Sequence, residues 1–207
     1  GSQPDSHPPG GGRRAVTQPI ADHLLLHAAT CSQWRAWLRK HHKTRTEIWL
    51  VYPKKHTGRP RIAYNDAVEE ALCFGWIDST VRTIDDEHFA QRFSVRRPGS
   101  QYSQANLERL RALAASDQVL PEVLSSLPDL DPTSFKIAED ILESVRASPT
   151  AWRNFRKFPP AYVRIRIAYI EAARGRPAEF AKRLAHFVRK TEQNKPFGYG
   201  GIEKHYR

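Results

Sequence analysis

Residues 76–95 read WIDSTVRTIDDEHFAQRFSV and determine the fold of the first half of the chain. The runs 76–84 and 88–95 are rich in β-branched and aromatic residues, and the acidic tripeptide 85–87 separates them. Two such runs joined by a short polar turn predict a β-hairpin. The run 46–52 has the same character and ends at Pro53, which predicts a third, buried strand.

Helical patterns surround these strands. Trp34, Trp37 and Leu38 recur at helical spacing. Asp66 followed by Glu69 forms a capping-box pattern, which predicts a helix that begins there and ends at Gly75. Ser103 is expected to cap a further helix, and proline-interrupted helical patterns follow at 138–147, 149–157, 160–174 and 178–192.

The pattern as a whole predicts an α+β fold, in which a small antiparallel sheet with helices is followed by a basic helical domain. The expected organisation is a disordered Pro- and Gly-rich tail over 1–19, an α+β domain with the hairpin over 20–100 and a helical domain over 101–193. Residues 194–207 form a tail rich in glycine and aromatic residues, which we expect to dock on the body of the protein.

The charge of the chain is concentrated near its C-terminal end. The formal net charge is +11, from 33 Lys and Arg against 22 Asp and Glu. Residues 151–207 hold 14 basic and 4 acidic side chains, whereas residues 1–150 are nearly balanced with 19 and 18. Such a basic surface fits nucleic acid or an acidic partner, and it fits an ordinary solvated face equally well.

Several classes of protein are disfavoured by the sequence. No apolar run approaches the roughly 18 residues that a membrane-spanning helix needs. Cys31 and Cys73 are too few for a disulfide framework and lack the clustered spacing of a zinc site. Phosphate-cradling and dinucleotide-binding glycine motifs are absent. We therefore expect a cytoplasmic protein with no metal and no cofactor, and the sequence does not indicate an oligomeric state.

The hairpin also carries the candidate site. Strand alternation places Trp76, Asp78 and Arg82 on one face, and Arg92 and Arg96 on one face of the partner strand. If the two faces coincide, Asp78 lies beside arginines, whose forked donors suit a carboxylate or phosphate. This arrangement predicts a pocket for a small anionic molecule, and the alternative is a structural ion pair on a solvated sheet face.

The turn after the hairpin and the C-terminal tail extend this candidate site. Asp78 is the candidate catalytic acid–base group, should the protein be an enzyme. The predicted ligand-binding residues are Trp76, Arg82, Arg92, Arg96, Arg97, Ser103, Asn106, Lys195 and Tyr199. Their chemistry combines an aromatic stacking surface, cations and the start of a helix, where an anion is stabilised.

These residues resemble a known family, the YdeI/OmpD-associated family, whose members are commonly labelled bacteriocin-protection proteins. The motifs that carry the resemblance are Ala71-Leu-Cys-Phe-Gly-Trp-Ile-Asp78, Arg82, Gln91-Arg-Phe93, Arg96-Arg-Pro98, Ser103 with Asn106, Phe158-Pro-Pro-Ala-Tyr162, Ile170-Glu-Ala-Ala-Arg174, Lys182-Arg-Leu184 and the tail from Phe197 to Tyr206. The similarity spans roughly residues 22–206. Tyr102 stands where the family pattern has Trp, and 114–120 lacks the usual Gly-Met turn.

The resemblance implies a small α+β domain followed by a helical one, in a soluble protein of stress response or antimicrobial tolerance. It implies no cofactor and no catalytic residue set. Two functions therefore stay open: binding of a small anion beside the 76–96 hairpin, with enzymatic activity undecided, or an interaction protein that binds nucleic acid or an acidic partner through the basic helical domain.

Overall fold

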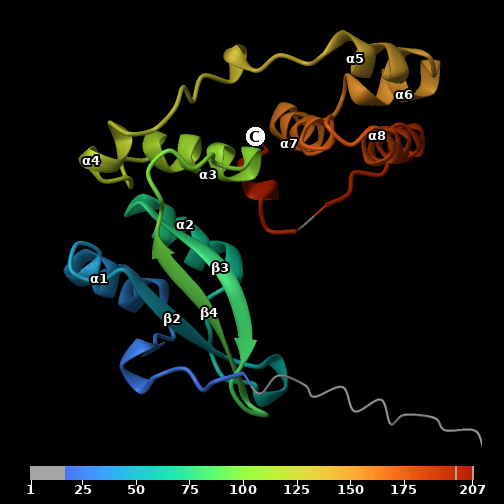
Figure 1. The fold of residues 1–207 in the computed structure, drawn as a ribbon. Coiled ribbons are helices and arrows are strands. Elements are labelled where there is room, and N and C mark those ends of the chain that lie inside the picture. Colours follow the sequence, from blue (N-terminus) through green and yellow to red (C-terminus); the bar gives the residue numbers. More distant parts are fainter. Residues whose placement is uncertain (1–16, 199, 207) are drawn as a thin grey trace, which may run out of the picture.

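A computed structural model describes residues 17–198 and 200–206 (Figure 1). Its sheet has the strand order β1-β2-β4-β3. The strands are β1 (Leu25–His27), β2 (Glu47–Pro53), β3 (Trp76–Thr83) and β4 (His88–Val95). The predicted hairpin and buried strand are therefore confirmed. The sheet is mixed rather than purely antiparallel, because the short β1, which the sequence did not reveal, pairs parallel to β2.

Two helices cover one face of this sheet and form the first hydrophobic core. They are α1 (Cys31–His41) and α2 (Tyr64–Cys73). Trp34 and Leu38 of α1 are fully buried against sheet residues such as Leu50 and Phe93. On the other face Trp49, Val51 and Ala90 pack against the segment that contains Ile20, Leu24 and Leu25. The second face is covered only in part, because most of β3 stays accessible to solvent.

The start of α2 differs from the sequence expectation. The helix begins at Tyr64, and its N-cap residue Ala63 makes no side-chain cap. Asp66 and Glu69 therefore lie inside the helix and are free to contact other parts of the chain. A true capping box is present instead at α1, where Thr30 and Gln33 exchange hydrogen bonds between side chain and backbone.

The chain after residue 103 is helical, and its last four α-helices, over residues 139–192, build a separate core. The helices of this part are α3 (Gln104–Ala115), α4 (Pro121–Leu124), α5 (Glu139–Arg146), α6 (Pro149–Phe155), α7 (Pro160–Glu171) and α8 (Pro177–Glu192). Leu110 of α3 and Val123 of α4 belong to the first core. The second core is built by α5–α8, and its most deeply buried residues include Ile141, Ile167, Ile170 and Phe187. The predicted helical segments after residue 138 agree with α5–α8 to within a few residues. The α+β class with C-terminal helices is confirmed.

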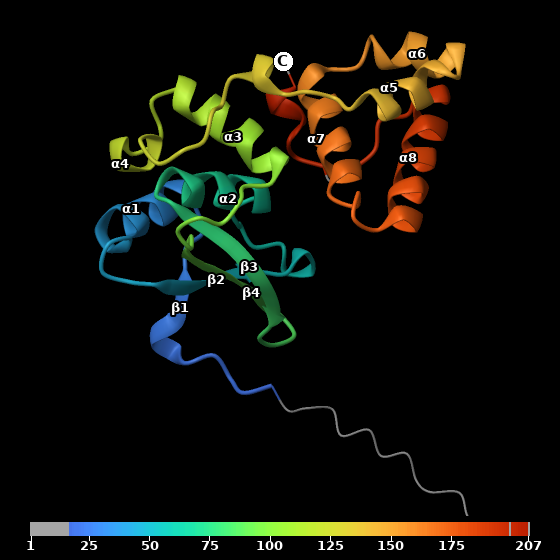
Figure 2. The ribbon, with the colours of Figure 1, turned by 45° about the horizontal axis from the view of Figure 1, so that its top comes forward.

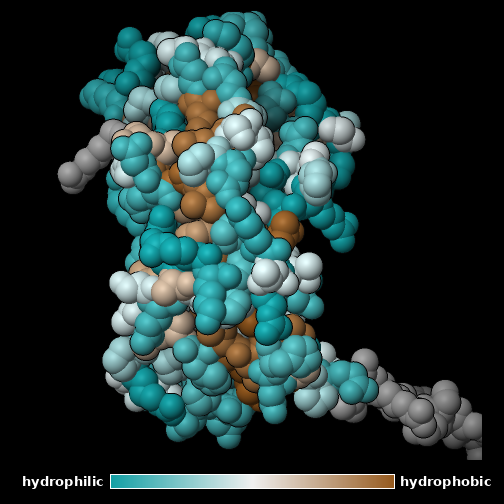
Figure 3. Space-filling view, turned by 90° about the vertical axis from the view of Figure 1, so that its left-hand side faces the viewer, coloured by the Kyte–Doolittle hydropathy of each residue, from teal (hydrophilic) through white to brown (hydrophobic). Residues whose placement is uncertain are grey.

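Helix α3 stands between the two cores, above α2 on one side and beside α7 on the other (Figures 1 and 2). Ser103 caps α3 as predicted, because its side chain accepts a hydrogen bond from the backbone of Asn106. Short 3-10 turns complete the chain at Asp22–Leu24, Lys55–Thr57, Pro132–Ser134 and Glu203–His205. On the face seen in Figure 3 hydrophilic residues dominate, and apolar residues are visible in two areas, one in each half of the molecule.

Candidate functional site

The turn that follows the hairpin encloses a cleft of about 840 Å³ together with β3, β4 and the start of α3. We call it the hairpin cleft. The residues of the predicted site that line it are Asp78, Arg92, Arg96, Arg97, Ser103 and Asn106. The short turn 96–103 joins the hairpin to the start of α3, and it therefore brings Asp78 of β3 and Asn106 of α3 to the same cleft. The cleft has the size of a small-molecule site.

Two hydrogen bonds to one oxygen hold the Asp78 side chain. Its Oδ2 accepts from the Tyr64 hydroxyl at 2.7 Å and from Gln91 Nε2 at 3.0 Å. Burial raises the pKa of Tyr64 to about 12, and the Asp78 carboxylate adds to this rise. Tyr64 is therefore a neutral donor at neutral pH. Among the described residues neither Arg82 nor Arg92 pairs with Asp78, so the ion pair that alternation suggested is not formed.

The three cleft arginines differ in how far their charge is neutralised. Arg92 pairs with Glu47, at 2.5 Å between Nε and Oε2. Arg96 lies over the Tyr102 ring, with 3.4 Å between the guanidinium carbon and the ring centroid, and donates to the carbonyl of Ser100. Arg97 is exposed and has no ion pair in the described part of the chain. Arg96 and Arg97 therefore supply positive charge that no carboxylate among the described residues cancels.

A chain of hydrogen bonds links the cleft to the interior. Asn106 Oδ1 accepts from Arg109 at 3.0 Å, and Arg109 also donates to Asn65 Oδ1 at 2.7 Å. Asn65 in turn donates to the carbonyl of Gly200 at 3.1 Å. Asn106 is therefore held in place by a network that reaches the C-terminal tail.

Arg82 does not line the cleft, and a bulge in β3 places it on the sheet face opposite Asp78, next to Ala90 and farther along the sheet than Arg92. Asp78 pairs with Phe93, and Val81 pairs with Gln91, so three steps along β3 match two along β4. The extra residue reverses the alternation, which places Arg82 opposite Ala90 on the other face of the sheet. There its guanidinium lies 5.5 Å from the Trp49 ring centroid and donates to the carbonyl of Gln18.

Two further residues of the predicted site, Trp76 and Lys195, do not line the cleft. Trp76 is only 1% exposed and donates to the His42 carbonyl at 3.3 Å, so it belongs to the first core. Lys195 is exposed beyond the end of α8 and does not line the cleft. Tyr199 lies outside the described residues.

Sequence reasoning missed three residues that shape the cleft. Tyr102 carries Arg96, and Tyr64 and Gln91 orient Asp78. Gln91 left a signal, since it alternates with Phe93 at a core-facing position where an apolar residue is expected. Its side-chain oxygen also accepts from the Tyr52 hydroxyl at 3.2 Å. Tyr64 gave no such signal, because its role depends on where α2 begins.

The tail docks on α2 and α7 rather than on the hairpin. Lys204 pairs with Asp66 at 3.0 Å and with Glu69 at 2.9 Å. His205 contacts Glu69 at 2.7 Å, and the Tyr206 ring meets the Tyr162 ring edge-on at 5.9 Å. The described tail residues 200–206 therefore join the two cores, and none of them lines the hairpin cleft.

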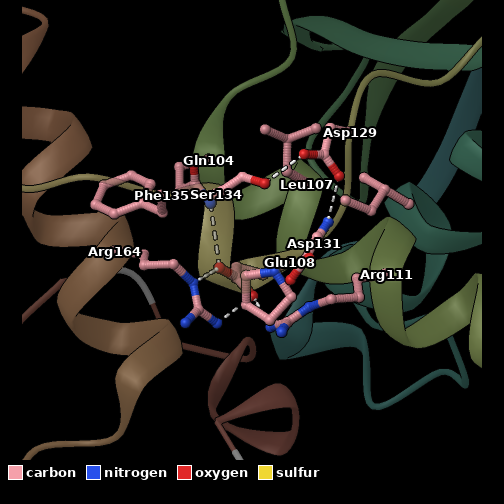
Figure 4. Close-up of a pocket in the computed structure, with 11 residues that line it drawn as sticks. Gln104, Leu107, Glu108, Arg111, Asp129, Asp131, Ser134, Phe135 and Arg164 are labelled. Carbon is pink, nitrogen blue, oxygen red and sulfur yellow. Dashed lines mark hydrogen bonds and ion pairs between the residues drawn. The ribbon is translucent and has the colours of Figure 1, made fainter.

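A smaller pocket of about 190 Å³ lies at the junction of the two cores (Figure 4). Glu108 of α3 accepts hydrogen bonds from Arg164 of α7 at 2.5 and 3.0 Å and from Gln104 at 3.1 Å, and it also pairs with Arg111. Burial alone would raise the pKa of Glu108, but the hydrogen bonds from Arg164 and Gln104 hold it below its ordinary value. Since these charged groups hydrogen-bond and pair with one another, we interpret this pocket as a structural contact that holds α3 against α7.

In the described part of the chain no group of three or more His, Cys, Asp or Glu residues is placed to hold a metal ion. None of its helices is long and apolar enough to cross a membrane.

The fold and the cleft define an α+β protein with an arginine-rich cleft and a helical C-terminal part. Residues 134–194 match the model of the family described as bacteriocin-protection, YdeI or OmpD-associated. Residues 26–126 match a second model, described as a domain of unknown function (DUF8412). No curated protein and no solved structure matches the chain.

The sequence motifs that resemble the YdeI/OmpD-associated family fall in two segments, which match two different family models. The resemblance is confirmed over 134–194, which includes the motifs 158–162, 170–174 and 182–184. The hairpin motifs and the cleft lie within 26–126 and so belong to the segment matched by the second model.

Proposed function

We propose that the protein binds a small anionic molecule in the hairpin cleft. The observation that carries the proposal is the pair Arg96 and Arg97, whose charge no carboxylate among the described residues neutralises. Arg96 is fixed by Tyr102, so little side-chain entropy is lost when it binds an anion. Forked guanidinium donors recognise a carboxylate or a phosphate equally well.

Asp78 narrows the class of ligand. Both hydrogen bonds that it receives go to Oδ2, and Oδ1 accepts none from the described residues. A carboxylate oxygen at the wall of a cationic cleft favours a ligand that carries a hydroxyl or amine donor besides its anionic group. We therefore assign Asp78 a positioning role toward a hydroxylated or aminated anion, such as a phosphorylated polyol.

The family description suggests a role in protection from antimicrobial peptides. A chain with a net charge of +11 repels a cationic peptide, so we favour a role through the small anion over direct capture. We also propose a cytoplasmic location, which both cysteines support because they are free.

Nucleic-acid binding by the basic helices is less well supported. Arg164, Arg174 and Arg183, three of the basic residues of this segment, are engaged by carboxylates within the chain. Phosphate-driven binding would weaken steeply as salt rises from about 50 to 200 mM. Such a response with a mixed-sequence DNA duplex would favour this alternative.

A thermal-shift titration with glycerol phosphate and inorganic phosphate tests the proposal. A ligand at about 100 times its Kd adds roughly 2.7 kcal/mol to the free energy of unfolding, which raises the Tm of a chain of this length by about 5–11 °C. Arg97→Ala should reduce the response to both compounds. Asp78→Asn should leave the Tm shift with inorganic phosphate unchanged, and it should reduce the amount by which the shift with glycerol phosphate exceeds it.

Arg82→Ala is the matched control, because it removes the same charge from the same hairpin but outside the cleft. Its response should equal that of the parent protein. The proposal is overturned if neither compound raises the Tm, or if Arg97→Ala responds as the parent does.

A further inference from the structure

A second cavity, of about 550 Å³, lies between α7 and α8 and is bordered by Phe197 from the segment after α8. We call it the α7–α8 cavity. It shares no lining residue with the hairpin cleft. The charged residues that line it in the described part of the chain are four cations, Arg166, Lys182, Arg183 and Arg189, and one carboxylate, Glu179. The cavity is therefore cationic and lies entirely in the basic helical part.

The remaining walls of the cavity are apolar and aromatic. Ile170 and Phe187 are exposed by only 1% and 0%, and they form part of the second core. Tyr169 and Phe197 add two rings. The backbone N–H of Phe197 donates to the Tyr162 hydroxyl at 3.2 Å, which ties this ring to α7. Cavities of this size and lining hold small organic molecules rather than single ions.

Arg166 lies close to both rings and has no anionic partner among the described residues. Its guanidinium carbon is 5.3 Å from the Phe197 centroid and 5.8 Å from the Tyr169 centroid. Its Nε is buried and has no hydrogen-bond partner among the described residues. A buried donor without an acceptor is unfavourable, and the cost is removed when an anion binds.

The backbone at Gly198 preserves this arrangement. Its φ is +131°, and a Cβ there would lie 2.9 Å from the guanidinium carbon of Arg166. A side chain at this position would force the Arg166 guanidinium to move.

The other cations of the cavity differ in availability. Arg183 is engaged, because it pairs with Glu179 at 2.9 Å and covers the Tyr169 ring at 3.9 Å. Arg189 donates to His186 Nδ1 at 2.9 Å, and burial together with Arg189 and Lys190 lowers the pKa of His186. His186 is therefore a neutral acceptor at neutral pH. Lys182 is exposed and has no ion pair in the described part of the chain.

We propose that the α7–α8 cavity binds an amphipathic organic anion, namely an aromatic ring or short hydrocarbon chain that carries one carboxylate, sulfonate or phosphate. The apolar part packs on Phe187 between the two rings. The anionic group meets Arg166 and the exposed cations Lys182 and Arg189 at the rim. An inorganic anion would leave the apolar walls uncovered, and a neutral aromatic molecule would leave Arg166 unpaired.

A fluorescence titration of the full chain with anilinonaphthalene sulfonate tests this proposal. The matched neutral probe is N-phenylnaphthylamine, which has the same rings without the sulfonate. We expect saturable binding of the sulfonate and at least about tenfold weaker binding of the neutral probe, since one charge-assisted hydrogen bond accounts for about a factor of ten. Arg166→Gln should weaken the sulfonate about tenfold, and the exposed Lys182→Ala should weaken it by a smaller factor.

Two control variants locate the binding. Arg153→Ala removes an exposed cation of the same helical part that does not line the cavity. Arg97→Ala removes a cation of the hairpin cleft. Both should bind the sulfonate as the parent does. The proposal fails if Arg166→Gln and Lys182→Ala both bind like the parent, if the neutral probe binds as tightly as the sulfonate, or if Arg97→Ala abolishes binding.

Discussion

Glu108→Gln tests whether the buried carboxylate between α3 and α7 stabilises the whole molecule. The Glu108 side chain is 2% exposed and accepts two hydrogen bonds from Arg164, at 2.5 and 3.0 Å. A glutamine has nearly the same shape but places an amide N–H₂ where an acceptor is needed. The substitution therefore leaves buried guanidinium donors without a charged partner.

The size of the effect follows from the burial of the partners. Removing one member of a buried ion pair costs about 3–5 kcal/mol. Arg164 and Arg111 keep 12% and 32% of their side-chain exposure, so water partly replaces the lost carboxylate. We therefore expect a loss of about 3 kcal/mol, near the lower end of that range. For a chain of this length the Tm falls by about 6–12 °C.

Urea unfolding followed by both tryptophan fluorescence and far-UV circular dichroism measures this loss. Glu139→Gln is the control, because Glu139 and its partner Arg146 are 65% and 45% exposed. Exposed pairs contribute at most about 1 kcal/mol. A double variant with Arg164→Met should lose less than the sum of the single losses, because the two residues interact directly. A loss below about 1 kcal/mol for Glu108→Gln, or one equal to the control, would refute the reasoning.

Three further predictions concern pH, the tail and the cysteines. Because the folded-state pKa of Glu108 is lowered, its stabilisation is complete above the ordinary glutamate pKa of about 4.3 and is lost as pH falls through the folded value. The difference in unfolding free energy between parent and Glu108→Gln should shrink in acid, and a constant difference would contradict this. Gly201→Ala should destabilise the docked tail, since φ is +94° and the new Cβ would lie 1.7 Å from Asn65 Nδ2. Limited proteolysis, followed as trimming of the C-terminal end, measures this effect, and Gly58→Ala is the control because a Cβ at Gly58 meets no atom within 4 Å. Burial raises the pKa of Cys73 to about 11, so iodoacetamide at neutral pH should label Cys31 first; equal rates by mass spectrometry would disprove this.

Local patterns in the sequence predicted the elements well. The hairpin runs 76–84 and 88–95 correspond to Trp76–Thr83 and His88–Val95, and the last helix, expected over 178–192, is Pro177–Glu192. These elements are visible in sequence because a repeat of two or 3.6 residues marks each of them. The three-residue β1 is too short to show any repeat.

The site was predicted only in part, for reasons of pairing and burial. The bulge between Asp78 and Val81 moves Arg82 to the other face, and a bulge depends on the partner strand rather than on local sequence. In the sequence, Trp76 is equally compatible with a ligand-stacking side chain and with a core side chain, and only the folded structure shows that it lies in the core. Contacts across long stretches of chain, such as Glu108 with Arg164, leave no local pattern at all.

The anchoring of the tail on α2 affects the order in which the chain can complete its folding during synthesis. Glu69 is 8% exposed, and its partner His205 lies 136 residues later in the chain. At about 5–20 residues per second, roughly 7–27 s separate the synthesis of the two. During that interval α2 can pack on the sheet, but the Glu69 carboxylate does not yet have its ion pairs with the tail. The first core therefore reaches its final electrostatic balance after the second core has been synthesised.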